Sequence, residues 1–223
     1  MKTLAVIPAR EGSKGLPYKN VRMIAGLPLI GWTIHQALQS KILDKVIVST
    51  DGERIARISR TLGAEVLMRP PALAQDDSPI SQTVLHALEN YPGYDTVALL
   101  EPTSPLRKPN DIDNALESFK NADSLISVGE VHTEHPLIVK RMTKRSGYAA
   151  PYIKASRKVY RRQQLDKAYF PYGVIYIART DYYLKDKTFY SQSWQTHTHS
   201  LFLSFHPIQT LAFAKNRDSI NCR

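Results

Sequence analysis

A short segment near the N-terminus carries the charges and glycines needed to hold a polyphosphate. Gly12 and Gly15 lie within it, and because glycine lacks a Cβ, backbone N–H groups there can approach an anion closely. Fixed positive charges are supplied by Arg10, Lys14 and Lys19. The segment has neither the Gly-Lys-Ser/Thr of a Walker A loop nor the Gly-x-Gly-x-x-Gly of a dinucleotide loop. It therefore predicts a phosphate-binding loop of another kind, with a basic surface turn as the alternative.

The element before this loop is expected to be a buried parallel strand. Leu4 to Ile7 is an unbroken apolar run, the pattern of a strand covered on both faces of a sheet. Further strands are expected at residues 45–49, 65–68, 96–100 and 125–128. Helical patterns lie between the strands, at residues 28–39, 53–62, 81–90 and 111–121. This alternation predicts an α/β fold: an open, mostly parallel, twisted sheet with helices on both faces.

The same topology decides where the loops meet. In a parallel sheet with right-handed crossovers, the loops after successive strands lie on the carboxyl edge, where α/β proteins bind ligands. The loops after Ile7, Ser49 and Leu100 are therefore expected to converge. With 223 residues and no linker-like segment, the chain is predicted to form a single domain over residues 1–223.

Composition limits the compartment and the partners. The single cysteine, Cys222, excludes a disulfide framework and is typical of a protein from a reducing compartment. The chain has no apolar stretch long enough for a signal peptide or a membrane span, so we expect a cytoplasmic protein without a membrane partner. Its formal net charge of +10 fits anionic substrates, nucleic acid or no specific partner.

The basic residues are dispersed along the chain. Arg54, Arg57 and Arg60 recur every three residues and are expected on the solvated side of an amphipathic helix. In the densest cluster, Tyr152 and Tyr160 are interleaved with Lys154, Arg157, Lys158, Arg161 and Arg162. Such a pattern can bind RNA or DNA. Capture of an anionic substrate explains it equally well, and a nucleic-acid partner is not expected.

Five blocks of sequence resemble one family in their order and spacing. The first is Ile7-Pro8-Ala9-Arg10, with Gly12-Ser13-Lys14-Gly15-Leu16-Pro17 and Lys19-Asn20. The others are Ser49-Thr50-Asp51, Pro102-Thr103-Ser104-Pro105-Leu106-Arg107, Arg162-Gln163-Gln164-Leu165 and Gly173-Val174-Ile175-Tyr176-Ile177. Over about residues 1–190 the chain resembles the acylneuraminate cytidylyltransferases, or CMP-sialic acid synthetases, which implies their Rossmann-like nucleotidyltransferase fold.

The resemblance implies transfer of CMP from CTP to the anomeric hydroxyl of an acidic sugar, an N-acylneuraminate or a related nonulosonate, with release of pyrophosphate. The residues implied at the CTP are Arg10, Ser13, Lys14, Lys19, Asn20, Ser78 and Ser81. Arg10 and Lys19 are also implied as the catalytic pair, because the protein's task in phosphoryl transfer is to offset charge on the phosphate oxygens. Either cation could instead form a structural ion pair, and Ser78 or Ser81 could cap the following helix.

The residues implied at the sugar are Glu101, Ser104, Arg107, Arg162, Tyr172 and Tyr176. Glu101 and Tyr172 depart from the family, which commonly has Gln and Asn at these positions. A carboxylate at position 101 would repel the sugar's own carboxylate unless it faces a hydroxyl or amino group. These departures favour a legionaminate-like or otherwise modified nonulosonate over N-acetylneuraminate itself. Arg107 could instead serve a structural carboxylate.

Between Val131 and Lys167 the alternation of strands and helices stops. Scattered charges, tyrosines and His135-Pro136 replace the periodic apolar pattern. In the family that the chain resembles, the segment matching residues 131–167 is a small dimerisation subdomain that reaches the partner's active site. The resemblance thus implies a homodimer in which Arg162 meets the substrate of the neighbouring subunit. A long surface loop is the alternative.

The C-terminal segment lacks the metal-binding signature of the family, an Asp-x-Asp that binds Mg²⁺. Residues 187–217 contain no Asp or Glu, and His206-Pro207-Ile208-Gln209-Thr210 resembles a remnant of the signature in a frameshifted or divergent tail. The implied cofactor is Mg²⁺ with unknown protein ligands, Asp51 and Glu101 being the alternatives, and we expect weak Mg²⁺ binding with nucleotide binding retained. A nucleotide-binding homologue with impaired turnover is therefore one alternative function, and a CMP-Kdo-type nucleotidyltransferase is another.

Overall fold

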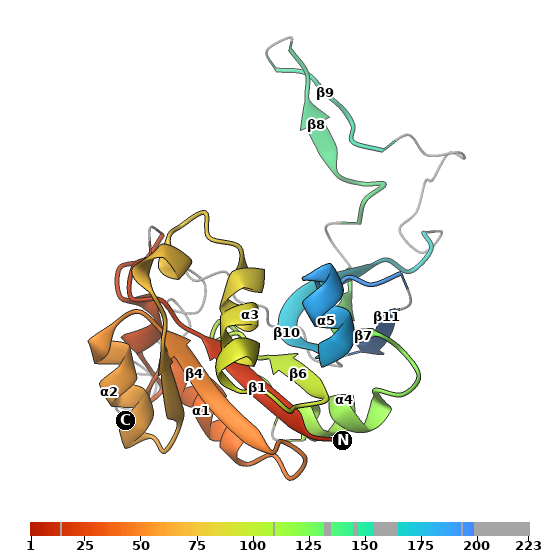
Figure 1. The fold of residues 1–223 in the computed structure, drawn as a ribbon. Coiled ribbons are helices and arrows are strands. Elements are labelled where there is room, and N and C mark those ends of the chain that lie inside the picture. Colours follow the sequence, from red (N-terminus) through yellow and green to blue (C-terminus); the bar gives the residue numbers. More distant parts are fainter. Residues whose placement is uncertain are drawn as a thin grey trace, which may run out of the picture.

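A seven-stranded sheet forms the centre of the computed structural model (Figure 1). The structure describes residues 1–13, 15–108, 110–131, 135–144, 147–153, 165–192 and 194–198. The strand order across the sheet is β11-β7-β10-β6-β1-β4-β5. In chain order these strands are β1 (Thr3–Pro8), β4 (Lys45–Thr50), β5 (Glu65–Met68), β6 (Thr96–Leu99), β7 (Ser124–Glu130), β10 (Tyr169–Arg179) and β11 (Trp194–Thr198).

The sheet is mostly parallel, as the alternation of strands and helices predicts. β1 pairs in parallel with β4 and with β6, β4 with β5, and β7 with β11. β10 is the exception, because it runs antiparallel to both of its neighbours, β6 and β7. The sequence pattern did not predict this strand, which brings residues 169–179 between two elements formed much earlier in the chain.

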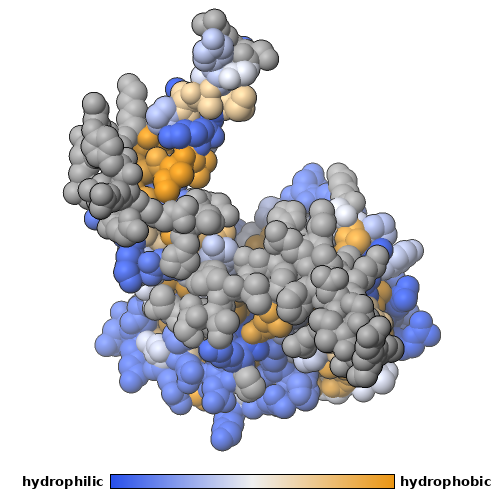
Figure 2. Space-filling model, turned by 180° about the vertical axis from the view of Figure 1, so that it is seen from behind, coloured by the Kyte–Doolittle hydropathy of each residue, from blue (hydrophilic) through white to orange (hydrophobic). Residues whose placement is uncertain are grey.

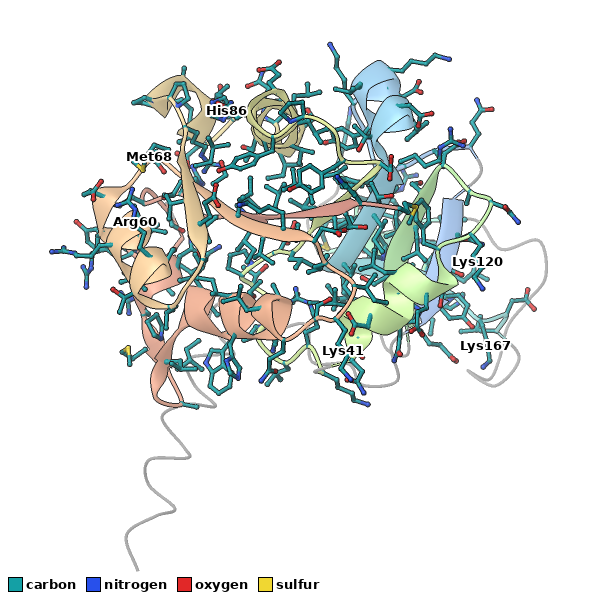
Figure 3. The ribbon with its side chains drawn as sticks, turned by 60° about the horizontal axis from the view of Figure 1, so that its bottom comes forward. Lys41, Arg60, Met68, His86, Lys120 and Lys167 are labelled. Atoms are coloured by element: carbon teal, nitrogen blue, oxygen red, sulfur yellow. The ribbon has the colours of Figure 1, made fainter. Side chains whose placement is uncertain are left out.

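Helices cover both faces of the sheet (Figure 3). Buried residues of α1 (Leu29–Leu38), α2 (Glu53–Thr61) and α4 (Asp111–Ser118) belong to one apolar cluster. α3 (Ile80–Asn90) and α5 (Thr180–Asp186) contribute to a second cluster on the opposite face. The strands alternate between the two, so that Ala5 and Ile7 join the first cluster whereas Leu4 and Val6 join the second. The predicted fold class is therefore confirmed.

Element boundaries differ little from those predicted. The helix expected to reach residue 121 ends at Ser118, because Phe119 is extended and Asn121 has a positive φ of 56°. Arg54, Arg57 and Arg60 are exposed on α2, as its amphipathic pattern predicts. Among the described residues, no helix is both long and apolar enough to cross a membrane.

Several short elements connect or extend the sheet. They are the 3-10 helices η1 (Lys19–Val21) and η2 (Pro71–Ala74), the pair β2 (Met23–Ile24) and β3 (Leu27–Pro28), and the pair β8 (Lys140–Met142) and β9 (Ala149–Pro151). The antiparallel β8–β9 hairpin falls in the segment where the alternation stops, and it projects from the body of the molecule (Figure 1). We call this projecting hairpin the arm.

Candidate nucleotide site

A cavity of about 280 Å³ lies at the carboxyl edge of the sheet. It is lined by Pro8, Arg10, Ser13, Lys19, Asn20, Arg69, Leu73, Ala74, Gln75, Asp76, Ser78, Ile80, Thr83, Glu101, Pro102 and Thr103. These residues follow β1, β5 and β6, so the loops after three parallel strands meet at this point. The loop after β4 lies next to them, since Asp51 Oδ1 accepts a hydrogen bond of 3.1 Å from the Glu11 backbone N–H.

Arg10 enters the cavity directly after β1. Its guanidinium forms an ion pair with Asp76, and its backbone oxygen accepts a hydrogen bond of 3.0 Å from Asn20 Nδ2. Asn20 is buried, so this bond holds the two ends of the loop together. The residues predicted at the phosphate end, Arg10, Ser13, Lys19 and Asn20, thus line one cavity.

Lys19 is the second cation of the cavity and begins η1. Burial lowers the pKa of its ammonium group, and the neighbouring Arg10 lowers it further, while Glu101 acts in the opposite direction. A buried cation whose charged form is disfavoured gains most from an anionic ligand. The environment of Lys19 is therefore suited to a phosphate group.

Arg69 is a third cation of the cavity, and the sequence analysis missed it. It follows β5, and its side chain is 6% exposed, with Nη1 donating a hydrogen bond of 2.8 Å to Thr83 Oγ1 of α3. Its Nε is buried and has no hydrogen-bond partner among the described residues. Burial lowers the pKa of Arg69, partly offset by Asp51. The one available signal was its position after the strand predicted at residues 65–68, where side chains reach the carboxyl edge.

Glu101 lines the cavity and follows the end of β6 by two residues. Burial raises the pKa of its carboxyl group, although a 3.2 Å hydrogen bond from Thr103 Oγ1, Lys19 and Arg107 each act to lower it. Gly173 of β10 packs against this carboxylate: a Cβ on Gly173 would lie 2.8 Å from Glu101 Oε2. Burial raises the pKa of Tyr176, and the Glu101 carboxylate raises it further. The Tyr176 hydroxyl, like this carboxylate, lies beside Gly173.

Ser104 and Arg107 are buried and do not line the cavity. The resemblance implied both of them as sugar contacts. Arg107 is 4% exposed and donates hydrogen bonds to Val174 O (2.7 Å from Nη2) and Gln36 Oε1 (2.9 Å). Ser104 Oγ donates to Gly173 O at 3.3 Å. Burial lowers the pKa of Arg107 to about 10. Both side chains therefore fasten the loop after β6 to β10. The sequence alone does not show these bonds, because their carbonyl acceptors come close only in the folded chain.

The two serines before α3 differ in position. Ser78 lines the cavity, but its Oγ also accepts a hydrogen bond from the Gln75 N–H (3.1 Å) and donates one to Ala72 O (2.9 Å). It therefore stabilises the turn that leads into the helix and does not cap α3, which Pro79 precedes. Ser81 lies in the first turn of α3 and outside the cavity lining.

Tyr172 belongs to the irregular part of β10, where its ring packs edge-on against Phe170 with centroids 5.0 Å apart. It does not line the cavity among the described residues. Lys14, Arg162, the other basic residues clustered at 154–162 and the acid-free segment from residue 199 onward lie outside the described residues.

The described residues do not by themselves fit a metal ion. Within the described ranges, no three His, Cys, Asp or Glu side chains gather closely enough to hold one. Asp76 is engaged by Arg10, and burial favours the neutral form of Glu101, which is a poor ligand for a hard cation.

Comparison with known proteins now assigns the chain to a family. A family model described as cytidylyltransferase matches residues 4–214. The chain belongs to the cytidylyltransferase family.

Individual relatives agree with this assignment. N-acylneuraminate cytidylyltransferase of Streptococcus agalactiae serotype III is 38% identical over 195 residues, which are 86% of this chain and 46% of the relative. CMP-N,N'-diacetyllegionaminic acid synthase of Legionella pneumophila is 38% identical over 198 residues, 86% of this chain and 84% of the relative. The chain spans about half the length of the streptococcal relative and most of the Legionella one.

Solved structures share the fold at low sequence identity. A CMP:2-keto-3-deoxy-manno-octonic acid synthetase complexed with CTP superposes with a TM-score of 0.73 at 18% identity, covering 99% of this chain and 100% of that one. A 4-diphosphocytidyl-2C-methyl-D-erythritol synthase from Anaerococcus prevotii gives a TM-score of 0.62 at 10% identity, covering 98% and 99%. These likenesses show the nucleotidyltransferase fold.

Proposed function

We propose that this cytidylyltransferase transfers CMP from CTP to the anomeric hydroxyl of an acidic nonulosonate and releases pyrophosphate. The observation that carries the proposal is the meeting of Arg10, Lys19 and Arg69 in one cavity at the carboxyl edge of the sheet. Burial disfavours the charged forms of Lys19 and Arg69, so a bound triphosphate would compensate charges that the fold leaves poorly solvated. The relatives named for this reaction support the choice of nucleotide.

In the proposed reaction the anomeric hydroxyl gives up its proton to water as its oxygen forms a bond to the α-phosphorus of CTP, and the bond from that phosphorus to the leaving pyrophosphate breaks. The protein's contribution is positioning and charge stabilisation. Arg10 and Lys19 would act as catalytic cations on the phosphate oxygens, while Arg69, fixed by Thr83, would hold the triphosphate from the other side of the cavity. Ser13, Asn20 and Ser78 would complete the nucleotide site, with Lys14 contributing from the same loop.

For the sugar, the proposal places Glu101 and Tyr176 at the acceptor side, with Tyr172 and the partner subunit's Arg162 as outer contacts. Glu101 can accept a hydrogen bond from a hydroxyl or an amide N–H, and it disfavours a carboxylate at the same place. Ser104 and Arg107 would act indirectly, by fastening the Glu101 loop to β10. A legionaminate-like nonulosonate is the favoured acceptor, supported by the Legionella relative.

We also propose that the arm makes the enzyme a homodimer. Ile138, Val139, Met142, Tyr148, Tyr152 and Ile153 are all exposed on the arm and its base. Figure 2 shows hydrophobic surface on this projection. Exposed apolar surface on a projecting hairpin is favourable only when another surface covers it.

Mixing Arg162→Ala with Lys19→Ala subunits should restore activity through a hybrid site. If subunits that exchange show no complementation, Arg162 lies outside the partner's site.

We also propose how the enzyme depends on Mg²⁺ and in which cellular compartment it acts. Because the described carboxylates do not fit a metal, we propose that the protein binds Mg²⁺ weakly and turns over slowly. A Mg²⁺ titration that saturates pyrophosphate release at ordinary millimolar metal would contradict this. Consumption of CTP fits an enzyme of the cytoplasm, where nucleoside triphosphates are abundant.

The decisive experiment is pyrophosphate release from CTP with a panel of acceptors: N,N'-diacetyllegionaminate, N-acetylneuraminate and Kdo. We expect turnover with CTP and a nonulosonate, and none with UTP or GTP. Preference for Kdo would support the alternative sugar class. CTP binding by calorimetry without turnover would indicate a nucleotide-binding homologue, and salt-sensitive binding of single-stranded RNA in place of CTP would refute the proposal.

A further inference from the structure

The phosphate loop, defined here as residues 9–20, contacts helix α2 at two separate places. The first contact involves Glu11. Its backbone N–H donates to Asp51, and its side chain packs so closely on Gly52, which precedes α2, that a Cβ there would lie 2.6 Å from the Glu11 Cβ. The carboxylate thus lies at the N-terminal end of the helix, where the free N–H groups favour negative charge.

The second contact is formed by Tyr18 and Arg54. The Arg54 guanidinium carbon lies 5.5 Å from the centre of the Tyr18 ring, within the range of a cation–π interaction. Arg54 belongs to the first turn of α2 and Tyr18 to the end of the phosphate loop. Tyr18 is 53% exposed, so no apolar core holds its ring in place, and the Arg54 side chain is its identified ring partner.

The backbone at Tyr18 sets the direction of Lys19. Tyr18 has φ 56° and ψ 30°, a left-handed conformation that residues other than glycine rarely adopt. It is followed at once by η1, in which the Lys19 N–H donates to Leu16 O (3.2 Å) and the Val21 N–H donates to Tyr18 O (3.1 Å). Relaxation of Tyr18 toward an ordinary conformation would therefore turn Lys19 away from the cavity.

We propose that Arg54 and Tyr18 form a clasp that positions Lys19 for the triphosphate. The inference rests on the proposed function, because Lys19 is taken to bind CTP. It assigns both residues a positioning role: Arg54 holds the ring, the held ring maintains the left-handed turn, and the turn presents the ammonium group to the cavity. Glu11 anchors the start of the loop on the same helix, so α2 supports the loop at both ends.

The test compares Arg54→Ala with Arg57→Ala, a matched control on the same exposed side of α2. Arg54→Ala and Tyr18→Ala should each lower kcat/KM for CTP about two- to fivefold, the scale of one exposed cation–π contact. Tyr18→Phe, which keeps the ring, and Arg57→Ala should stay at the wild-type value. The effect should appear in KM for CTP and leave KM for the sugar unchanged.

A second readout does not depend on turnover. Hydrogen exchange at the Lys19 and Val21 amides should accelerate in Arg54→Ala and Tyr18→Ala, but not in Arg57→Ala. If the wild type does not use CTP, the proposed function fails, while this exchange comparison still decides whether the clasp holds the loop. Equal exchange and equal kinetics in Arg54→Ala and Arg57→Ala would overturn the clasp.

The last variant separates positioning of Lys19 from a direct effect on the nucleotide. When CTP binding is measured, Arg54→Ala should weaken it in the wild-type background and have less than about a twofold effect in the Lys19→Ala background, since coupled residues are not additive. Equal weakening in both backgrounds would show that Arg54 acts on CTP without Lys19, and would refute the mechanism.

Discussion

Replacement of Arg69 by methionine should separate activity from stability. Arg69 is buried, its Nη1 donates a hydrogen bond to Thr83, and its Nε has no hydrogen-bond partner in the part of the chain that the structure describes. A fold that retains such a poorly satisfied cation beside a cavity keeps it at a cost to stability, which a ligand can offset. Methionine matches the length of the apolar stem and removes the charge.

The expected magnitudes follow from these contacts. Leaving the Nε buried without a partner costs about 1–3 kcal/mol, whereas the lost bond to Thr83 is worth about 1.5–3 kcal/mol because its donor is charged. The two contributions nearly cancel, so the melting temperature of Arg69→Met should lie within about 4 °C of the wild type. Loss of one preorganised cation should lower kcat/KM for CTP about 10²- to 10³-fold.

The assay combines steady-state pyrophosphate release with thermal unfolding in the absence and presence of CTP. The wild type should unfold at a higher temperature with CTP, because a ligand that binds the folded state stabilises it. Arg69→Met should lose most of that increase. Thr83→Val is the matched control. It keeps the charge of Arg69 but removes the hydroxyl that fixes the guanidinium, so kcat/KM should fall only about two- to tenfold.

Two results would refute this reasoning. If Arg69→Met kept kcat/KM within tenfold of the wild type, Arg69 would not contact the triphosphate. If the variant instead unfolded more than about 10 °C below the wild type without nucleotide, Arg69 would be a structural residue whose bond to Thr83 outweighs its burial.

Two further predictions concern the other groups at the cavity. Since burial lowers the pKa of Lys19 below the ordinary lysine value of 10.5, its charge is lost at a lower pH than that of an ordinary lysine, and CTP affinity should begin to fall as pH rises while still below that value. Lys19→Arg should remove this decline, and an unchanged pH profile would contradict it. Gly173→Ala should raise the sugar KM, because the new Cβ would lie 2.8 Å from Glu101 Oε2 at a φ of 74°. Gly93→Ala is the control, because Gly93 has the same kind of positive φ, 86°, but open space around it. Both variants should unfold about 2–8 °C below the wild type, since both strain the backbone. Only Gly173→Ala should alter the sugar KM.

Local patterns predicted most of the fold. The strands at residues 45–49 and 65–68 and the helix at 53–62 follow from apolar periodicity, which depends only on neighbours along the chain. Convergence of the loops follows from topology, since parallel strands end on one edge. β10 was missed because Pro171 and Gly173 interrupt its pattern and its partners, β6 and β7, are distant in sequence.

Site residues could be predicted where they belong to a sequence motif, but not where burial in the folded chain determines what a side chain contacts. Arg10 and Lys19 stand in a recognisable loop and line the cavity. Arg69 follows β5 and belongs to none of the sequence blocks that resemble the family. Arg107 has the opposite problem: it belongs to a motif, but its guanidinium donates to Val174 O of β10 and to Gln36 Oε1, which only the folded chain brings close to it.

The irregularity in β10 gives the protein a place to accumulate sequence change. Five steps along β10 separate Pro171 from Tyr176, whereas their partners on β7, Val128 and Ile126, are two apart. The surplus residues bulge out of the ladder beside Glu101, while regular pairing resumes on either side. A substitution at position 172, within the bulge, therefore leaves the register of the sheet on either side of it unchanged.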